Sequence, residues 1–316
     1  MNTVSQTNIA LGSEATLKIV SDASAKQQQE LFVELWTKIY AFEKQFSRFL
    51  PYSELSMFNR SAGIRQPISP AFKELLLTAQ KLSAETKGLF NPFLLPAIQR
   101  AGYTRSFVEG AESDVHDDYS DKAVVAIEKL EIGTDWACIP YGTAIDLGGC
   151  GKGYLADQLA KALQGKVIGY SVSLGGDIVT FGTDKHGQNW NVLIQSANAI
   201  EGEAVGDITM PKTQYAIATS GTTKRKGIHN GKSWHHIIDP NTLQPSQTDL
   251  IMTTVGHESG VYADVLASCA IIVGSKKAPS LLKRFAVRDF VLQKGASHTN
   301  ATTAYEGENI EIYKIR

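Results

Sequence analysis

The sequence predicts an α+β protein, in which helices pack against a mixed or antiparallel sheet. Helical patterns fill much of the first third of the chain, whereas the middle is a succession of short apolar runs separated by turns. Strands and helices do not alternate with the regularity of βαβ units, which disfavours a doubly wound parallel sheet. The length of 316 residues, with 43% hydrophobic and 20% charged residues, is typical of an ordinary globular protein.

The first elements follow from periodicity and from helix start and stop signals. A strand is expected over residues 13–20, where polar and apolar residues alternate. A long helix is expected over 25–46, because its apolar residues recur at helical spacing. A short helix near 53–59 precedes another over 70–86, which has a proline in its first turn and a glycine just past its end.

The rest of the chain is expected to consist mostly of strands within one domain spanning residues 1–316. Residues 88–103 read as irregular, and the acidic segment at about 108–123 predicts a mobile loop. Further helices are expected over 152–163, around Asp264 and over 279–285. Strands are expected within 124–133, 137–149, 167–182, 190–196, 214–221, 289–294 and 309–315.

Composition excludes several classes of protein and site. A net charge of −1 disfavours nucleic-acid binding, and the basic run at residues 224–226 is either a solvated face or a neighbour of phosphate. Three widely spaced cysteines without a CxxC motif predict neither a disulfide framework nor a zinc site. With no signal-peptide pattern, lipid-attachment cysteine or apolar run of about 20 residues, we expect no membrane anchor and a cytoplasmic location.

Asp264 and Ser268 are the most informative pair of residues. They lie four positions apart in a predicted helix, so both side chains lie on one face. A carboxylate and a hydroxyl are hard oxygen ligands of the kind that Mg²⁺ takes together with phosphate oxygens and water. In the alternative interpretation, Asp264 satisfies the start of its own helix and Ser268 is a small residue at a helix contact.

Two glycine-rich turns suggest close approach of backbone to a phosphate-bearing ligand. The segment 146–154 (DLGGCGKGY) joins a predicted strand to a predicted helix, whose start favours negative charge. The segment 173–178 (SLGGDI) lies between two apolar runs, and Asp177 could add a polar contact. A tight turn with positive φ in the first segment and a hairpin turn in the second explain them equally well.

Two further segments carry polar side chains, each with a functional and a structural interpretation. Thr219 and Ser220 end a predicted strand with hydroxyls that could donate to phosphate or flavin, or merely close a turn. His236, within HHIIDP, could donate to a diphosphate, whereas Asp239 before proline is typical of a turn. No third ligand nearby supports a transition-metal site.

Taken in order, these segments resemble the ApbE family of FAD:protein FMN transferases. The resemblance rests on FSRFLPYSELSMFN, GLFNPFLLPAIQRAGY, DLGGCGKGY, SLGGDI, ATSG, HIIDP and ADVLAS, and it spans most of the chain. It implies a single ApbE-like domain that binds FAD with Mg²⁺ and transfers FMN to a threonine hydroxyl of a client flavoprotein, releasing AMP. The client threonine is expected in a short flavinylation motif ending in Gly-Ala-Thr or similar.

The resemblance also implies roles for individual residues. Asp264, Ser268 and the backbone carbonyl of Gly151 correspond to the metal ligands. His236 corresponds to a histidine near the FAD diphosphate, and Asp177 or His236 is expected to be catalytic, although the general base stays open. The remaining flavin-binding or bracing positions are Ser47, Glu54, Asn59, Asp146, Lys152, Gly175, Gly176, Thr219 and Ser220.

Three positions depart from the family pattern, and two other functions stay open. Ser268 replaces threonine and Gly151 replaces alanine, both with the ligating oxygen retained, while Asn91 replaces aspartate. An FAD diphosphatase would use water in place of the threonine and give FMN and AMP. A non-catalytic FAD-binding protein would bind FAD without needing Mg²⁺.

Overall fold

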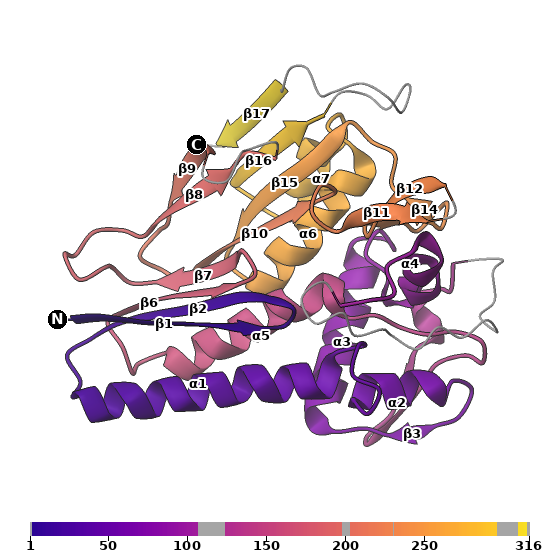
Figure 1. Cartoon of the computed structure of the whole chain (residues 1–316), viewed down its shortest axis with the longest axis horizontal. Coiled ribbons are helices and arrows are strands. Elements are labelled where there is room, and N and C mark those ends of the chain that lie inside the picture. The colour runs from indigo at the N-terminus through magenta and orange to yellow at the C-terminus, as the bar shows by residue number, and fades with distance from the viewer. Residues whose placement is uncertain (1, 107–123, 198–202, 230, 296–308, 315–316) are drawn as a thin grey trace. The chain divides into compact units, whose positions relative to one another are not determined.

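An eight-stranded sheet, in which every neighbouring pair of strands is antiparallel, is the largest element of the structure (Figure 1). The computed structural model describes residues 2–106, 124–197, 203–229, 231–295 and 309–314, so the predicted mobile loop at 108–123 lies outside the described residues. The sheet has the order β1 (Asn2–Ala10), β2 (Ser13–Ser21), β6 (Gly169–Leu174), β7 (Asp177–Phe181), β10 (Tyr215–Gly221), β15 (Leu250–His257), β16 (Asp289–Lys294) and β17 (Asn309–Lys314).

Four small sheets and a set of helices complete the described part of the chain. The small sheets pair β3 (Gln66–Pro67) and β4 (Glu131–Ile132) with β5 (Trp136–Cys138), β8 (Asn191–Gln195) with β9 (Ala204–Thr209), β11 (Lys226–His229) with β12 (Lys232–His235), and β13 (Ile238–Asp239) with β14 (Gln244–Pro245). The helices are α1 (Ala25–Phe46), α2 (Glu54–Arg60), α3 (Pro70–Glu85), α4 (Leu95–Ala101), α5 (Gly148–Leu163), α6 (Gly260–Val273) and α7 (Ala278–Arg284), with 3₁₀ turns η1 (Pro92–Leu94) and η2 (Ile127–Lys129). The predicted α+β class is confirmed.

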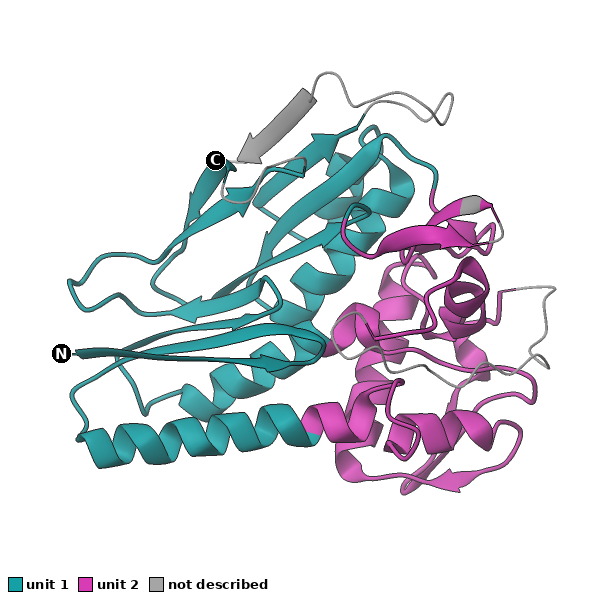
Figure 2. Ribbon diagram, viewed as in Figure 1, with its two compact units in different colours: residues 1–41, 152–223, 247–316 teal, residues 42–151, 224–246 magenta. Residues whose placement is uncertain are grey.

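The chain divides into two compact units (Figure 2). Unit 1 comprises Met1–Ala41, Lys152–Thr223 and Gln247–Arg316, and unit 2 comprises Phe42–Gly151 and Lys224–Ser246. The divisions at residues 41/42 and 151/152 fall inside α1 and α5. The prediction of one domain over 1–316 stays a prediction.

In unit 1, α6 packs against β10 and β15 of the large sheet (Figure 1). The helix is apolar on almost every side, and ten of its fourteen residues are buried, as expected for a helix inside a core. The hairpin of β8 and β9 adds a second core, in which Ile194 and Ile208 pack with Ile217 of β10 and Val291 of β16. The contacts of α6 with β10 and β15 hold it on the sheet that carries several of the predicted site residues.

Unit 2 is built from short helices and small sheets. Phe46, at the end of α1, lies against Phe72 of α3, which in turn makes an edge contact with Phe58 of α2. A separate cluster joins Leu94 and Ala97 around α4 to Ile238 of β13. These two cores hold the segments that carry the remaining predicted site residues.

The expected elements are largely present, with shifts that have physical causes. The bounds of α1 agree with the prediction, but α5 begins four residues earlier than expected because its glycines have helical backbone. The segment 88–103, expected to be irregular, contains η1 and α4, in which prolines occupy first-turn positions that tolerate them. No strand was expected at β1, β3, β9, β11, β12, β13, β14 or β15. The strands expected within 124–133 and 137–149 are reduced to β4 and to the end of β5.

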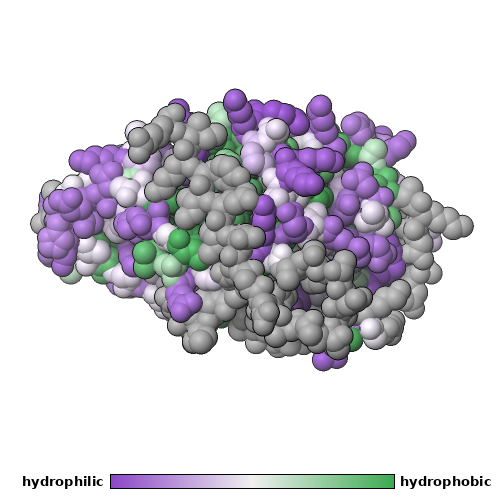
Figure 3. All heavy atoms as spheres, turned by 90° about the horizontal axis from the view of Figure 1, so that it is seen from above, coloured by the Kyte–Doolittle hydropathy of each residue, from purple (hydrophilic) through white to green (hydrophobic). Residues whose placement is uncertain are grey.

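Among the coloured residues of the face shown in Figure 3, hydrophilic ones predominate and hydrophobic ones form small separate patches. None of the helices in the described ranges combines the length and the apolar character that a membrane span requires. All three cysteines carry free thiols.

Candidate functional site

Asp264 and Ser268 lie on successive turns of α6, as the sequence predicts. The Asp264 side chain is buried, and its Oδ2 accepts a hydrogen bond of 3.1 Å from the backbone N–H of Gly153 on α5. The Oγ of Ser268 lies 2.8 Å from the Oγ of Ser220 on β10. Asp264 is therefore positioned by a neighbouring helix, and the alternative that it caps its own helix is wrong.

Lys152 and Asp177 form an ion pair in the same unit. Asp177 opens β7 and is buried, and its second carboxylate oxygen accepts a hydrogen bond of 3.3 Å from the backbone N–H of Thr219. The hydroxyl of Thr219 lies 2.9 Å from that of Thr254 on β15. Because Ser220 follows Thr219 on β10, these contacts place Lys152 and Asp177 beside the strand that contacts α6.

Unit 1 thus brings six of the predicted site residues into one polar cluster, which we call the α6 cluster. They come from four elements that are far apart in the sequence but adjacent in the packing: α5, β7, β10 and α6. The α6 cluster consists of Lys152, Asp177, Thr219, Ser220, Asp264 and Ser268.

The two glycine-rich segments adopt different structures. Gly175 and Gly176 form the two-residue turn of the β6–β7 hairpin with φ of 64° and 96°, so the hairpin alternative is confirmed for this segment. This turn directly precedes Asp177 and so fixes the start of β7. The glycines of 148–153 lie instead in the first turns of α5 without positive φ, and the tight-turn alternative is wrong there.

Gly153 is needed for close helix packing rather than for backbone freedom. A Cβ atom on Gly153 would lie 2.3 Å from the backbone oxygen of Gly260, at the start of α6. No real Cβ atom approaches a backbone oxygen so closely, so only glycine lets α5 and α6 meet here. This contact allows the Gly153 N–H to reach Asp264.

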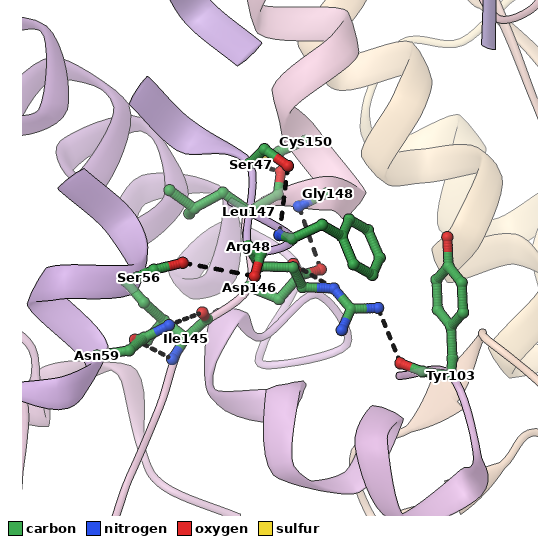
Figure 4. A network of polar contacts seen from close by, with 11 residues as sticks. Ser47, Arg48, Ser56, Asn59, Tyr103, Ile145, Asp146, Leu147, Gly148 and Cys150 are labelled. Atoms are coloured by element: carbon green, nitrogen blue, oxygen red, sulfur yellow. Dashed lines mark hydrogen bonds and ion pairs between the residues drawn. The ribbon is translucent and has the colours of Figure 1, made fainter. Parts of the chain in front are cut away.

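In unit 2, the predicted residues Asn59 and Asp146 take part in a second polar network (Figure 4). The amide of Asn59 makes two hydrogen bonds of 2.9 Å with the backbone N–H and C=O of Ile145. Asp146 then accepts a hydrogen bond of 3.2 Å from the N–H of Gly148 at the start of α5. Asn59 therefore braces the chain just before Asp146, while the hydroxyl of Ser47 accepts a bond of 3.3 Å from the N–H of Phe49.

Arg48 belongs to this network, and the sequence prediction missed it. Its Nε lies 3.4 Å from Oδ1 of Asp146, and one of its amino groups donates to the backbone oxygen of Tyr103 at 3.0 Å (Figure 4). Its guanidinium also lies over the rings of Phe49, at 4.2 Å, and of Tyr103, at 4.7 Å. The only signal in the sequence is a basic residue directly after Ser47, which does not reveal a buried ion pair.

Burial lowers the pKa of the Arg48 guanidinium from its ordinary value, and the neighbouring Asp146 carboxylate opposes that shift. The side chain of Arg48 is 5% exposed and that of Asp146 is 17% exposed. Because the Arg48 charge is almost completely removed from water, it is stable only beside an opposite charge. The ion pair therefore fixes the position of the Asp146 carboxylate.

Other predicted residues of unit 2 have mainly structural contacts. Glu54 accepts hydrogen bonds from the N–H and hydroxyl of Ser69, the N-cap residue of α3. Asp239 accepts a bond of 2.8 Å from the N–H of Asn241, so the turn alternative is confirmed for it. His236 packs edge-on against Tyr103, which also stacks on Trp234 of β12. The predicted catalytic residues Asp177 and His236 belong to different units, and each is described within its own.

The oxygen atoms that the α6 cluster offers as metal ligands suit a hard cation better than a soft one. Asp264, Ser268 and Ser220 present carboxylate and hydroxyl oxygens, which are the ligands that Mg²⁺ takes. Within the described ranges, no group of three or more His, Cys, Asp or Glu side chains is placed to hold a metal ion. This set therefore fits a cation that takes one protein carboxylate and obtains other ligands from hydroxyls, backbone, water and substrate phosphates.

Comparison with known proteins agrees with this arrangement of motifs. The family model described as "ApbE family" matches residues 11–291. A relative named FAD:protein FMN transferase, from Salmonella typhimurium, is 27% identical over 290 residues, which cover 85% of this chain and 79% of the relative. A protein of the same name from Escherichia coli strain K12 is 26% identical over 286 residues, covering 85% and 78%.

Two solved structures share the fold. The flavin transferase ApbE from Vibrio cholerae superposes with a TM-score of 0.77 at 23% identity, covering 99% of this chain and 97% of the other. The ApbE protein from Thermotoga maritima superposes with a TM-score of 0.80 at 17% identity, again covering 99% and 97%. Since the family model matches nearly the whole chain, and the fold agrees, this protein belongs to the ApbE family.

Proposed function

We propose that this protein is a FAD:protein FMN transferase, which moves the FMN moiety of FAD to a hydroxyl of a client flavoprotein and releases AMP. Membership of the ApbE family and the names of the relatives support this reaction. The observation that carries the proposal is the α6 cluster, in which α5 contacts Asp264 and β10 contacts Ser268, while Asp177 of β7 binds both Lys152 of α5 and Thr219 of β10.

The proposal includes a dependence on Mg²⁺, with Asp264, Ser268 and the Gly151 carbonyl as its protein ligands. Bound there, Mg²⁺ would neutralise charge on the diphosphate during phosphoryl transfer. Asp264 suits this role because it is an anionic oxygen ligand held in place by the Gly153 N–H. Ser220 holds the Ser268 hydroxyl on the same side of α6.

Other residues have proposed roles in binding and charge stabilisation. Asp177 holds the Lys152 ammonium group, which we assign to the substrate phosphates, and the Thr219 N–H orients Asp177. His236 is assigned to the FAD diphosphate and Asp146 to the flavin site, where Arg48 fixes its carboxylate. Catalysis of phosphoryl transfer depends mainly on such positioning and charge stabilisation.

The acceptor group is proposed to be a threonine hydroxyl in a short flavinylation motif of the client. Its oxygen attacks the phosphorus on the flavin side of the diphosphate, the bond to the AMP oxygen breaks, and the hydroxyl proton is lost. The proton passes to a base, for which Asp177, His236 and another carboxylate all stay open. The cytoplasmic location expected from the sequence stays a prediction, which cell fractionation tests.

The test is mass spectrometry of a client domain that carries such a threonine motif, after incubation with this protein, FAD and Mg²⁺. We expect the client to gain one FMN and AMP to appear in equal amount. In Asp264→Ala, the rate should fall by about 10²–10³-fold or more, because a preorganised charge-stabilising group typically contributes this much. Asp249→Ala is the matched control, since Asp249 is another unit 1 carboxylate that binds Ser275 outside the α6 cluster.

The other outcomes separate the alternatives. FMN and AMP formed without any client adduct would make the protein an FAD diphosphatase. FAD binding without either product, and without any effect of Mg²⁺, would indicate a flavin-binding protein. Wild-type transfer by Asp264→Ala, with an unchanged Mg²⁺ requirement, would contradict the metal assignment.

A further inference from the structure

The start of α6 is capped by a carboxylate from another helix. Asp157 of α5 accepts hydrogen bonds from the hydroxyl of Ser259 at 2.7 Å, from the N–H of Gly260 at 2.7 Å and from the N–H of Val261 at 3.1 Å. Ser259 is the N-cap residue of α6, yet its side chain makes no capping bond to that helix. Asp157 therefore satisfies backbone donors that a local side chain satisfies in most helices.

A second contact between the same helices lies one turn away. Gly153 and Asp157 are four residues apart on α5, and Gly260 and Asp264 are four residues apart on α6. Asp157 binds the N–H of Gly260, while the N–H of Gly153 binds the carboxylate of Asp264. The two bonds tie corresponding faces of the helices together, with the Gly153–Gly260 contact between them.

We infer that Asp157 is a positioning residue for the metal ligands of the proposed transferase. It fixes α6 along its axis and in rotation, and through α6 it fixes Asp264 and Ser268. Gly260 precedes Asp264 by one turn and Ser268 by about two turns, so a displacement at the start of the helix reaches both side chains. A misplacement of about 1 Å at a reacting centre can cost about 10²-fold in rate.

This inference rests on the proposed function, and Asp157→Asn is the variant that tests it. The amide has the size of the carboxylate but only one acceptor oxygen, so its NH₂ group faces a backbone or hydroxyl donor. At least one of the three bonds to α6 is lost. The chain offers a matched control in Asp249→Asn, because Asp249 accepts bonds from the N–H and hydroxyl of Ser275 just before α7.

The measurement is binding of Mn²⁺, as a probe of the Mg²⁺ site, to the full chain with FAD but without client, followed by electron paramagnetic resonance. All variants are measured well below the unfolding temperature of the least stable one, so that every protein is folded. We expect the Kd for Mn²⁺ to rise about tenfold or more in Asp157→Asn, with a parallel rise in the Mg²⁺ concentration for half-maximal FMN transfer. Asp249→Asn should bind Mn²⁺ like the wild type, even where its unfolding temperature falls by a similar amount.

A folded Asp157→Asn protein that binds Mn²⁺ within twofold of the wild type would overturn the positioning role. A wild-type protein that does not bind Mn²⁺ would instead overturn the proposed metal site itself. If Asp157→Asn does not fold, Ser259→Ala removes one of the three bonds and leaves the carboxylate in place. It should raise the Kd by about threefold, as expected for one hydrogen bond, and an unchanged Kd would overturn the inference.

Discussion

At the scale of single residues, two glycines two positions apart on α5 have different purposes. Gly153 allows the close contact with Gly260, whereas a Cβ atom on Gly151 would lie 3.5 Å from the ring of Phe42, an ordinary contact distance. Glycine is otherwise unfavourable inside a helix because of its backbone entropy. Close packing therefore explains why residue 153 is glycine despite the entropic cost, but it does not explain the glycine at residue 151.

Gly153→Ala should destabilise the protein by about 2 kcal/mol or more, because its Cβ overlaps backbone that cannot move without displacing α6. Gly151→Ala should be neutral or stabilising by up to about 1 kcal/mol, since alanine favours the helix. Urea-induced unfolding followed by circular dichroism measures both changes. Equal stability of the two variants would contradict the packing argument.

The largely buried ion pair of Arg48 and Asp146 is a second contact between single residues that stabilises the fold. Arg48→Met should destabilise the protein by about 2 kcal/mol, less than the ~3–5 kcal/mol of a fully buried pair, because Asp146 keeps some contact with water. Asp146→Asn in the same chain should recover part of the loss, since no unpaired carboxylate then remains. Urea-induced unfolding of the single and double variants gives the coupling, and strictly additive losses would show that the two residues do not interact.

At the scale of elements, β15 ends, just before the turn to α6, in a histidine whose burial makes its protonation depend on folding. His257 stacks on Tyr262, and its Nδ1 accepts a hydrogen bond of 3.0 Å from the N–H of Ser259. Burial lowers the pKa of His257 below its ordinary value, although the carboxylates of Glu258 and Asp157 oppose the shift.

A lowered pKa means that the unfolded chain binds the proton more tightly than the folded chain does. The contribution of His257 to stability is therefore fully present above the unfolded pKa of about 6.5 and is lost as the pH falls towards the folded pKa. His257→Asn keeps an acceptor for the Ser259 N–H but does not titrate. Its unfolding temperature should fall less steeply than that of the wild type between about pH 7 and pH 5, and equal slopes would show that His257 is not responsible.

At the scale of the whole molecule, two cysteines report on the two units separately. Cys150 in unit 2 and Cys269 in unit 1 are fully buried, and burial raises the pKa of the Cys269 thiol to about 12. Neither thiol should react with a disulfide reagent at pH 8 in the native protein, because burial keeps the reagent from both sulfur atoms. At Cys269 the raised pKa also leaves little of the reactive thiolate.

The divisions between the units fall inside α1 and α5, so unfolding one unit breaks helices that continue into the other. We therefore expect Cys150 and Cys269 to become reactive at the same urea concentration, in one cooperative transition. Mass spectrometry of alkylated peptides measures each thiol separately. Two distinct midpoints would show that the units unfold independently and would contradict the single-domain prediction.

Much of this fold could be predicted from the sequence, because local patterns specify local structure. The apolar spacing over 25–46 defined α1, and the alternation over 13–20 located β2. Strand β15 escaped prediction because seven of its eight residues are buried, so it lacks the alternation of a half-exposed strand. Strand β1 escaped for the opposite reason, since most of its residues are exposed and polar.

The sequence by itself determined the family, the fold class and all six residues of the α6 cluster, because each of these follows from residue types in a fixed order. Only the tertiary structure decided how those residues are held. The bonds from Gly153 to Asp264 and from Asp157 to the start of α6 join residues that are more than 100 positions apart. No local pattern encodes such contacts, because they arise when two helices pack closely enough for one to hold the other's backbone and side chains.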